Sequence, residues 1–181
     1  DRCLEEGYRV IVLDDLSKGR LQNVPKGIKF LHSNVCDSSI MTIFQTEKPD
    51  IVFHLAAQIS LHNSLRNPVE DAKVNALGTI NLLHAAKTVG IEKFVYSSTG
   101  GALYGEPEYI PCDESHPINP LSPYGQSKYF GEQYLELYRR LFQLNYVSLR
   151  YSNVYGPRQD PEGEAGVIAI FVNRMLKKQS P

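Results

Sequence analysis

Short apolar runs rich in β-branched residues alternate with helical patterns along the chain, and this alternation restricts the fold more than any other feature of the sequence. The runs lie at residues 9–14, 28–33, 50–56, 92–98 and 145–152. They are apolar without strict alternation, which is typical of strands buried on both faces of a parallel sheet. Strands separated by helices are connected as βαβ units. The sequence therefore predicts an α/β fold with a doubly wound parallel sheet, its strands all neighbours in one sheet.

Cap and turn residues place the helices between these runs. Asn67 followed by Pro68 is typical of a helix N-terminus, and Gly90 suits the end of that helix. Ser122 followed by Pro123 begins another helix. The Pro-rich stretch 105–121 is predicted to be a loop beyond the carboxyl end of the fourth strand. Open α/β sheets bind their ligands at that edge, so the loop is expected to lie beside the site.

The composition excludes several classes of protein. A chain of 181 residues suits one domain with a full core, and a net charge of −1 gives no basic field for nucleic acid or an anionic membrane. The three cysteines are odd in number and widely spaced, which favours the reducing cytoplasm over a disulfide framework. The apolar runs are far shorter than the roughly 20 residues of a membrane span. No metal site is predicted.

Tyr124 and Lys128 carry the sharpest chemical signal, a YxxxK spacing within SPYGQSKYFGE. Four residues apart on a helix, the phenol and the ammonium lie on one face. A free phenol has a pKa of about 10 and is a poor base at neutral pH, but a neighbouring positive charge favours the phenolate. Tyr124 is therefore a candidate base for a substrate hydroxyl, and Lys128 a candidate ligand of a nicotinamide ribose. The alternative is an ordinary tyrosine beside an exposed lysine.

The ends of three predicted strands carry further candidates. Thr99 closes a Ser-Ser-Thr run whose hydroxyls can share a proton with a reacting oxygen or simply bond to the backbone. Asp14 can bind a ribose 2′-OH and repel a 2′-phosphate, which favours NAD over NADP, or it can be only a turn former. Ala56 and Ala57 in HLAAQ allow close approach to a cofactor, or tight strand–helix packing. His54 in that segment is interpreted as a core residue rather than a base.

These motifs occur together in an order that is typical of one superfamily. Asp14, HLAAQ, VNALGT, SSTGGALYGEP, SPYGQSK and LRYSNVYGPRQ follow one another along the chain. On these motifs the chain resembles the extended short-chain dehydrogenases/reductases and, within them, the NAD-dependent epimerase/dehydratase family, with the UDP-glucose 4-epimerases most similar. The resemblance extends over essentially all 181 residues. It implies a Rossmann-type sheet and NAD as the cofactor.

The resemblance also implies a role for each matching residue. Tyr124 would be the catalytic base, Lys128 its partner, and Thr99 a hydroxyl that contacts both the sugar and the tyrosine. The implied cofactor contacts are Asp14, Asp15, Asn34, Val35, Leu55, Ala56, Ala57, Gln58, Asn75, Tyr124, Lys128 and Tyr151. The implied substrate contacts are Thr99, Tyr124 and Asn153. Asn34 departs from the more usual Asp of its position.

The implied reaction is C4 epimerisation of a sugar nucleotide of the UDP-glucose/UDP-galactose type, through transient NAD-dependent oxidation. Related dehydratases need an Asp-Glu pair just after the strand-end hydroxyl, whereas residues 100–103 read Gly-Gly-Ala-Leu. Two alternatives remain: an NAD(P)-dependent dehydrogenase or reductase of the same superfamily, and a non-catalytic NAD-binding protein of the same fold. The parent protein is expected to be a cytoplasmic homodimer that binds a UDP-sugar, with no nucleic-acid or membrane partner.

Compared with the family's pattern, the chain is expected to be truncated at both ends. Residues 1–8 resemble the tail of a helix that, in a dinucleotide-binding unit, follows a strand and a glycine-rich turn. We expect about 15–20 residues ahead of Asp1 and a small C-terminal substrate domain beyond residue 181. Residues 1–181 would then be a partial NAD-binding domain, inactive by itself, whose first strand has only one neighbour.

Overall fold

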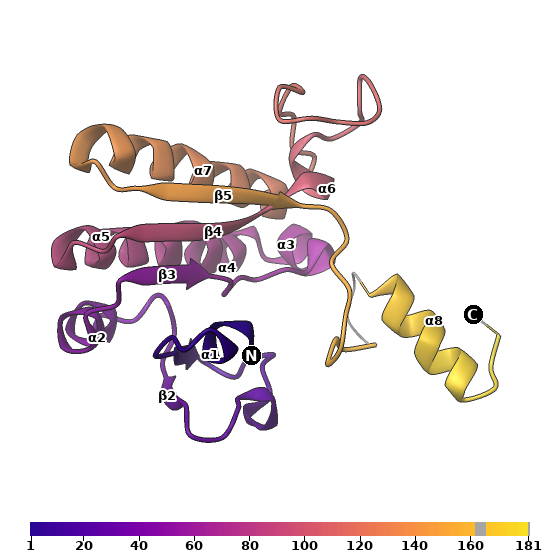
Figure 1. Ribbon diagram of the computed structural model, residues 1–181. Helices are drawn as coiled ribbons and strands as arrows, with labels where there is room; N and C mark the ends of the chain where they lie inside the picture. Colours follow the sequence, from indigo (N-terminus) through magenta and orange to yellow (C-terminus); the bar gives the residue numbers. More distant parts are fainter. Residues whose placement is uncertain (162–165, 181) are drawn as a thin grey trace.

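All five strands of the computed structural model, which describes residues 1–161 and 166–180, run parallel to their neighbours (Figure 1). The strands are β1 (Ile11–Asp14), β2 (Lys29–His32), β3 (Ile51–His54), β4 (Lys93–Thr99) and β5 (Tyr146–Tyr151). β1 pairs with β2, and separately β4 pairs with β3 on one side and β5 on the other. The predicted parallel α/β fold is confirmed.

The expectation of one continuous sheet is wrong. Among the described residues no ladder joins β1 to β3, so the strands form a two-stranded and a three-stranded sheet. Hydrophobic periodicity identifies strands but not which strands are adjacent, because adjacency depends on how distant segments pack. The separate expectation that the strand ending at Asp14 has a single neighbour is confirmed.

Helices and short helical turns connect the strands. They are α1 (Arg2–Glu5), η1 (Leu21–Asn23), α2 (Ser39–Glu47), α3 (Leu61–Arg66), α4 (Pro68–Ala72), η2 (Lys73–Leu77), α5 (Gly78–Val89), α6 (Gly100–Leu103), α7 (Pro123–Phe142) and α8 (Val167–Leu176). The predicted caps are confirmed: Asn67 Oδ1 accepts from Glu70 N at 3.2 Å, and Ser122 Oγ accepts from Gly125 N at 3.0 Å. Gly90 ends α5 in the left-handed conformation, with φ of 74°.

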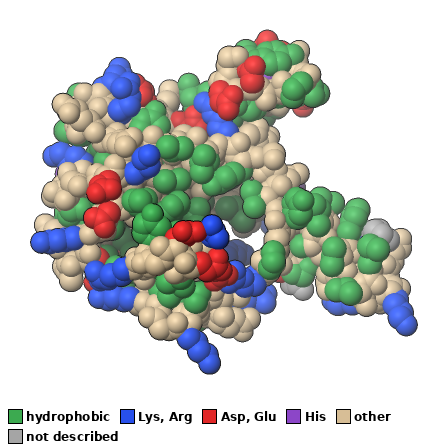
Figure 2. Space-filling view, viewed as in Figure 1, with side chains coloured by type: hydrophobic (Ala, Val, Ile, Leu, Met, Phe, Trp, Pro, Cys, Tyr) green, Lys and Arg blue, Asp and Glu red, His purple; other side chains and the backbone are tan. Residues whose placement is uncertain are grey.

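The core lies between the β3–β5 sheet and the helices α5 and α7. Leu83, Phe94, Tyr96 and Leu135 are completely buried there. The opposite face of the sheet is open, and Phe53 on β3 is 55% exposed. In Figure 1, α5 and α7 lie behind these strands, and Figure 2 shows hydrophobic side chains over the face in front. Among the described strands, burial on both faces, as predicted, therefore holds for β4 alone. β2, β3 and β5 each contain exposed residues, and every residue of β1 is partly exposed.

No helix in the described part of the chain combines the length and the apolar character needed to cross a membrane.

Candidate active site

The first turn of α7 lies beside the carboxyl end of β4, and this contact brings two hydroxyls together. Tyr124 follows the Pro123 that begins α7, and Thr99 is the last residue of β4. The Thr99 hydroxyl lies near enough to the Tyr124 phenol to favour its phenolate form, and it accepts a hydrogen bond from Ala102 N at 3.3 Å. A Cβ atom on Gly125 would collide with the carbonyl oxygen of Ala102, so glycine is required where α7 meets α6.

Lys128 lies one turn further along α7 and is only 4% exposed. Its Nζ donates to the carbonyl oxygen of Ser97 at 2.8 Å and lies 5.0 Å from the centre of the Tyr96 ring. Within the described residues it forms no ion pair. Burial disfavours the ammonium and lowers the pKa of Lys128 to about 8, against the opposing attraction of Asp71. The alternative of an exposed lysine is therefore wrong.

The pKa of Tyr124 is raised above its ordinary value in the protein alone. Burial is the largest cause of the higher pKa, the Thr99 hydroxyl opposes it, and the negative charge of Asp71 adds to the increase. The sequence predicted a pKa lowered by Lys128. The structure differs because desolvation of the phenol outweighs the favourable interactions, and the Lys128 ammonium bonds to Ser97.

Asn75 connects the segment after β3 to the helix that carries Tyr124. It is 2% exposed and lies in η2, a π-turn of the kind that often marks functional sites. Its Oδ1 accepts from Gln58 N at 2.8 Å, and its Nδ2 donates to Gln58 O at 2.9 Å. The same Nδ2 lies 3.1 Å from Asp71 Oδ1 and 3.2 Å from Ser127 Oγ. The predicted cofactor residues Gln58 and Asn75 are thus held in one network with α7.

Asp71 and Ser127 in this network were missed by the sequence analysis. They are 1% and 6% exposed, respectively. A signal existed for Asp71, since it precedes Asn75 by four residues and so shares its helix face. An acid in the first turn of a helix is also common for its interaction with the helix dipole, so this position alone does not indicate a site.

The segment after β3 combines a buried histidine with small and exposed residues. His54 is 3% exposed, its Nε2 lies 2.9 Å from Thr79 Oγ1, and burial lowers its pKa to about 3. It is therefore neutral, in agreement with its interpretation as a core residue. Leu55 is 65% exposed, and Ala56 and Ala57 are half-buried. An apolar side chain presented next to small residues suits contact with a ligand.

The predicted adenosine-binding residues lie at the carboxyl ends of β1 and β2. Asp14 Oδ1 accepts from Leu16 N at 2.7 Å, so Asp14 does form a turn. Among the described residues its Oδ2 accepts no protein hydrogen bond and is left to bind a ribose hydroxyl. Asp15 accepts from Ser17 N at 2.9 Å and from Asn34 Nδ2 at 2.6 Å. Asp14 is the last residue of β1, and Asp15, Asn34 and Val35 follow β1 and β2. All four therefore lie at the β1–β2 sheet and not at the sheet that carries Thr99.

The bond from Asn34 to Asp15 gives a physical reason for the amide at position 34. Burial works to raise the pKa of Asp15, but hydrogen bonds from Ser17 and Asn34 outweigh it and hold the pKa below its ordinary value. An aspartate at position 34 would put two carboxylates in contact. Val35, the next residue, is 6% exposed and packs so closely on α5 that a Cβ on Gly78 would lie 2.6 Å from its side chain.

Two predicted residues lie at and beyond the end of β5. Tyr151 is directly opposite Thr99 in the parallel register and is 39% exposed. Asn153 is exposed just past the strand. The structure therefore brings Tyr151 to the strand-end hydroxyls, whereas Asn153 makes no side-chain hydrogen bond within the described residues.

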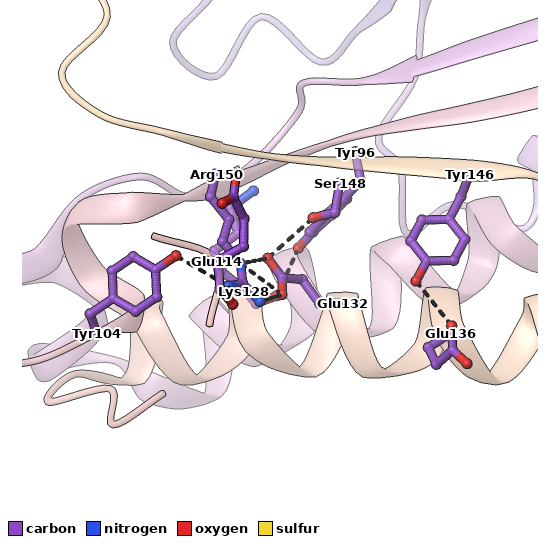
Figure 3. Close-up of polar contacts among 9 residues, drawn as sticks. All are labelled: Tyr96, Tyr104, Glu114, Lys128, Glu132, Glu136, Tyr146, Ser148 and Arg150. Atoms are coloured by element: carbon purple, nitrogen blue, oxygen red, sulfur yellow. Dashed lines mark hydrogen bonds and ion pairs between the residues drawn. The ribbon is translucent and has the colours of Figure 1, made fainter. Parts of the chain in front are cut away.

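An ion pair fixes α7 against β5 one turn beyond Lys128 (Figure 3). Glu132 and Arg150 are 10% and 20% exposed, and Arg150 donates to Glu132 from Nε at 3.0 Å and from Nη2 at 2.7 Å. Arg150 Nη1 reaches the Tyr104 hydroxyl at 3.1 Å and Glu114 O at 3.3 Å. The pair therefore also ties the Pro-rich loop to the helix that carries Tyr124.

The residues present fit a dinucleotide. Lys128 is a buried cation without an ion-pair partner in the described chain, and Ser97 Oγ beside it is buried without a hydrogen-bond partner there. Asp14 has a carboxylate oxygen to spare for a ribose. Leu55, the residue after β3, presents an exposed apolar side chain.

Comparisons with known proteins identify the family of the chain. The model of the NAD-dependent epimerase/dehydratase family matches residues 1–181. The UDP-glucose 4-epimerase of Mycolicibacterium smegmatis is 44% identical over 181 residues, which cover 97% of this chain and 58% of that protein.

Two solved structures are similar throughout. The UDP-glucose 4-epimerase of Thermotoga maritima with UDP-glucose superposes with a TM-score of 0.95 at 47% identity. That of Thermus thermophilus in complex with NAD superposes with a TM-score of 0.93 at 48% identity. Each alignment covers 98% of this chain and 58% of the other. The chain thus spans about 58% of the length of these relatives.

Proposed function

The chain belongs to the NAD-dependent epimerase/dehydratase family, and on this premise we propose that it is the NAD-binding part of a sugar-nucleotide C4 epimerase of the UDP-glucose/UDP-galactose type. One observation carries the proposal: the Thr99 hydroxyl and the Tyr124 phenol lie next to one another at the carboxyl end of β4, one helical turn from the buried Lys128 ammonium. That combination supplies a proton acceptor, a hydroxyl that can share the proton, and a positive charge.

The proton at the substrate O4 is the part of the reaction that this chain's residues handle. Thr99 donates or accepts at the sugar hydroxyl and passes the proton to the neighbouring Tyr124. Bound NAD would accept the hydride from C4 and return it, and its nicotinamide ring would add a positive charge. Positive charge beside the phenol favours the phenolate and offsets the burial that raises the pKa of Tyr124.

Binding is divided between the two sheets. We assign the adenosine end of NAD to Asp14, Asp15, Asn34 and Val35, and the nicotinamide end to Leu55, Ala56, Ala57, Gln58, Asn75, Tyr124, Lys128 and Tyr151. Lys128 binds the ribose hydroxyls with the protons that it does not donate to Ser97. Thr99, Tyr124 and Asn153 contact the sugar nucleotide. The substrate domain and the second subunit of a cytoplasmic homodimer belong to the full-length protein.

Tyr124→Phe in the full-length protein tests the base. The variant keeps the ring but loses the proton acceptor, so interconversion of UDP-glucose and UDP-galactose should slow by roughly 10²–10⁴-fold. Sugar-nucleotide binding should change little, because the lost interaction matters mainly in the transition state. The rate is followed by product composition, with NADH absorbance recorded in parallel.

Tyr129→Phe is the matched control. Tyr129 is on the same helix but lines the outer groove between α7 and β5, so the rate should be unchanged. Full activity of Tyr124→Phe would exclude Tyr124 as the base. Stoichiometric accumulation of NADH by the unmodified protein would favour the dehydrogenase alternative instead, since an epimerase regenerates its NAD.

A further inference from the structure

Asp71 is a buried acid that none of the assigned roles uses. It lies in α4, its side chain is 1% exposed, and its Oδ2 has no hydrogen-bond partner within the described residues. A buried carboxylate oxygen without a donor is costly, and such groups in native proteins often have a functional reason.

The other oxygen of Asp71 holds together two residues of the predicted cofactor site. Oδ1 accepts from Gln58 Nε2 at 2.9 Å and from Asn75 Nδ2 at 3.1 Å. The network continues from Asn75 to Ser127, whose hydroxyl donates to Tyr124 O at 3.0 Å. Asp71 is therefore linked through hydrogen bonds to the first turn of α7.

Titratable groups from three elements besides its own helix interact with Lys128, and Asp71 is the acid among them. Tyr96 on β4 lies under the ammonium, and its pKa is raised by burial. His54 on β3 is neutral, because burial and the charge of Lys128 both lower its pKa. On α7 itself, the pKa of Tyr124 is raised, and Glu132 is committed to Arg150. The Asp71 carboxylate on α4 attracts the ammonium. Hydrogen bonds between Asp71 and Asn75 and between Asn75 and Ser127 connect it to the residue that precedes Lys128.

We propose that Asp71 is a positioning residue of the site, whose buried negative charge keeps Lys128 protonated and whose Oδ1 fixes Asn75 and Gln58. Its effect on Lys128 is a property of the protein alone. Its consequence for catalysis rests on the proposed function.

The direction of the charge effect follows from the two opposing contributions at Lys128. Burial disfavours the ammonium and brings the pKa of Lys128 down to about 8, and the attraction of Asp71 limits that decrease. Lys128 is therefore protonated below about pH 8 and loses its charge above it. Removal of the Asp71 charge leaves burial unopposed, so the loss of charge should move toward neutral pH.

Asp71→Asn tests the proposal, because the amide keeps the size of the side chain and an oxygen for Gln58 and Asn75 but removes the charge. Lysine labelled with ¹³C at Cε is titrated by NMR in the full-length protein, and the Lys128 signal is assigned by its absence in Lys128→Arg. The pH midpoint of the Lys128 titration (the Lys128 midpoint) should fall by roughly 1 pH unit in Asp71→Asn. NAD affinity should fall at alkaline pH as Lys128 loses its charge. In Asp71→Asn this fall should occur at a lower pH than in the wild type.

Glu70→Gln is the matched control, since Glu70 is the neighbouring acid on α4 and is exposed, 3.9 Å from Lys73. It should leave the Lys128 midpoint unchanged. Asp71→Glu, which keeps the charge, should restore most of the wild-type midpoint even if packing lowers its stability. Asp71→Ser also removes the charge with a smaller side chain, and it should lower the midpoint in the same way as Asp71→Asn.

An unchanged Lys128 midpoint in both Asp71→Asn and Asp71→Ser would overturn the proposal. That result does not depend on the reaction. Conversely, a lowered midpoint in a protein that fails to interconvert UDP-sugars would support the role of Asp71 and reject the proposed function.

Discussion

At the scale of single residues, burial is the dominant influence on titration in the site. Desolvation raises the pKa of Tyr124 and lowers the pKa of Lys128 to about 8 and that of His54 to about 3. Each shift favours the neutral form. Burial alone therefore favours neutral side chains in the site. Added charge, from Asp71 or from a cofactor, decides which group ionises.

His54 should make the protein sensitive to mild acid. Its ring must accept a proton when the chain unfolds below pH 6.5, whereas in the folded protein its pKa is about 3. A group that binds protons more readily in the unfolded chain removes stability as the pH falls. Between pH 6.5 and 5 the loss amounts to about 2 kcal/mol. His54→Gln should lack this loss, measured by urea unfolding across that pH range.

His84→Gln is the control for that measurement, because His84 lies exposed on α5 and the substitution should not alter the pH dependence. If His54→Gln lost stability with acid as steeply as the wild type, the neutral assignment of His54 would be wrong.

At the scale of elements, close approach of α7 to β4 sets the position of the helix that carries Tyr124 and Lys128. A Cβ atom on Gly131 would lie 2.6 Å from Tyr96 Cζ and nearer still to the hydroxyl. Tyr96 is completely buried and its hydroxyl donates to Lys128 O at 3.4 Å. Because Tyr96 is buried, it has little room to move away from an added side chain. The close packing of α7 on β4 therefore requires glycine at position 131.

Gly131→Ala should therefore destabilise the protein by about 1–3 kcal/mol through overpacking. Tyr96→Phe removes the nearest atom, so the double variant should lose less stability than the sum of the single variants. Gly101→Ala is the control, since nothing lies within 4 Å of the added methyl group there. Strict additivity of Gly131→Ala and Tyr96→Phe would show that the two residues are not in contact.

At the scale of the whole molecule, stability is expected to be uneven because the strands form two sheets. β4 is paired on both sides and faces the core, whereas β1 pairs, within the described residues, with β2 alone, and all four of its residues are partly exposed. Amides of β4 should exchange with solvent close to the rate of global unfolding, and those of β1 and β2 faster. Hydrogen exchange on residues 1–181 measures both. Equal protection of β1 and β4 would mean that the two sheets unfold as one unit.

Local chemistry was sufficient to predict much of the fold. Asn67, Ser122 and Gly90 were identified as helix ends because caps and stops depend on one residue and its immediate backbone. The i, i+4 relation of Tyr124 and Lys128 is likewise a property of the helix they share. The sequence alone thus determined the parallel α/β class and the candidate catalytic pair.

Tertiary structure alone decided how the strands pair and how far the site residues are buried and their pKa values shifted. The division into two sheets and the open face at Phe53 depend on which distant segments pack together. The pKa of Tyr124 is raised because its phenol is desolvated, and Asp71 belongs to the site because α4 packs on α7. Burial and electrostatic interaction are sums over neighbours from the whole chain, and a one-dimensional pattern does not contain those distances.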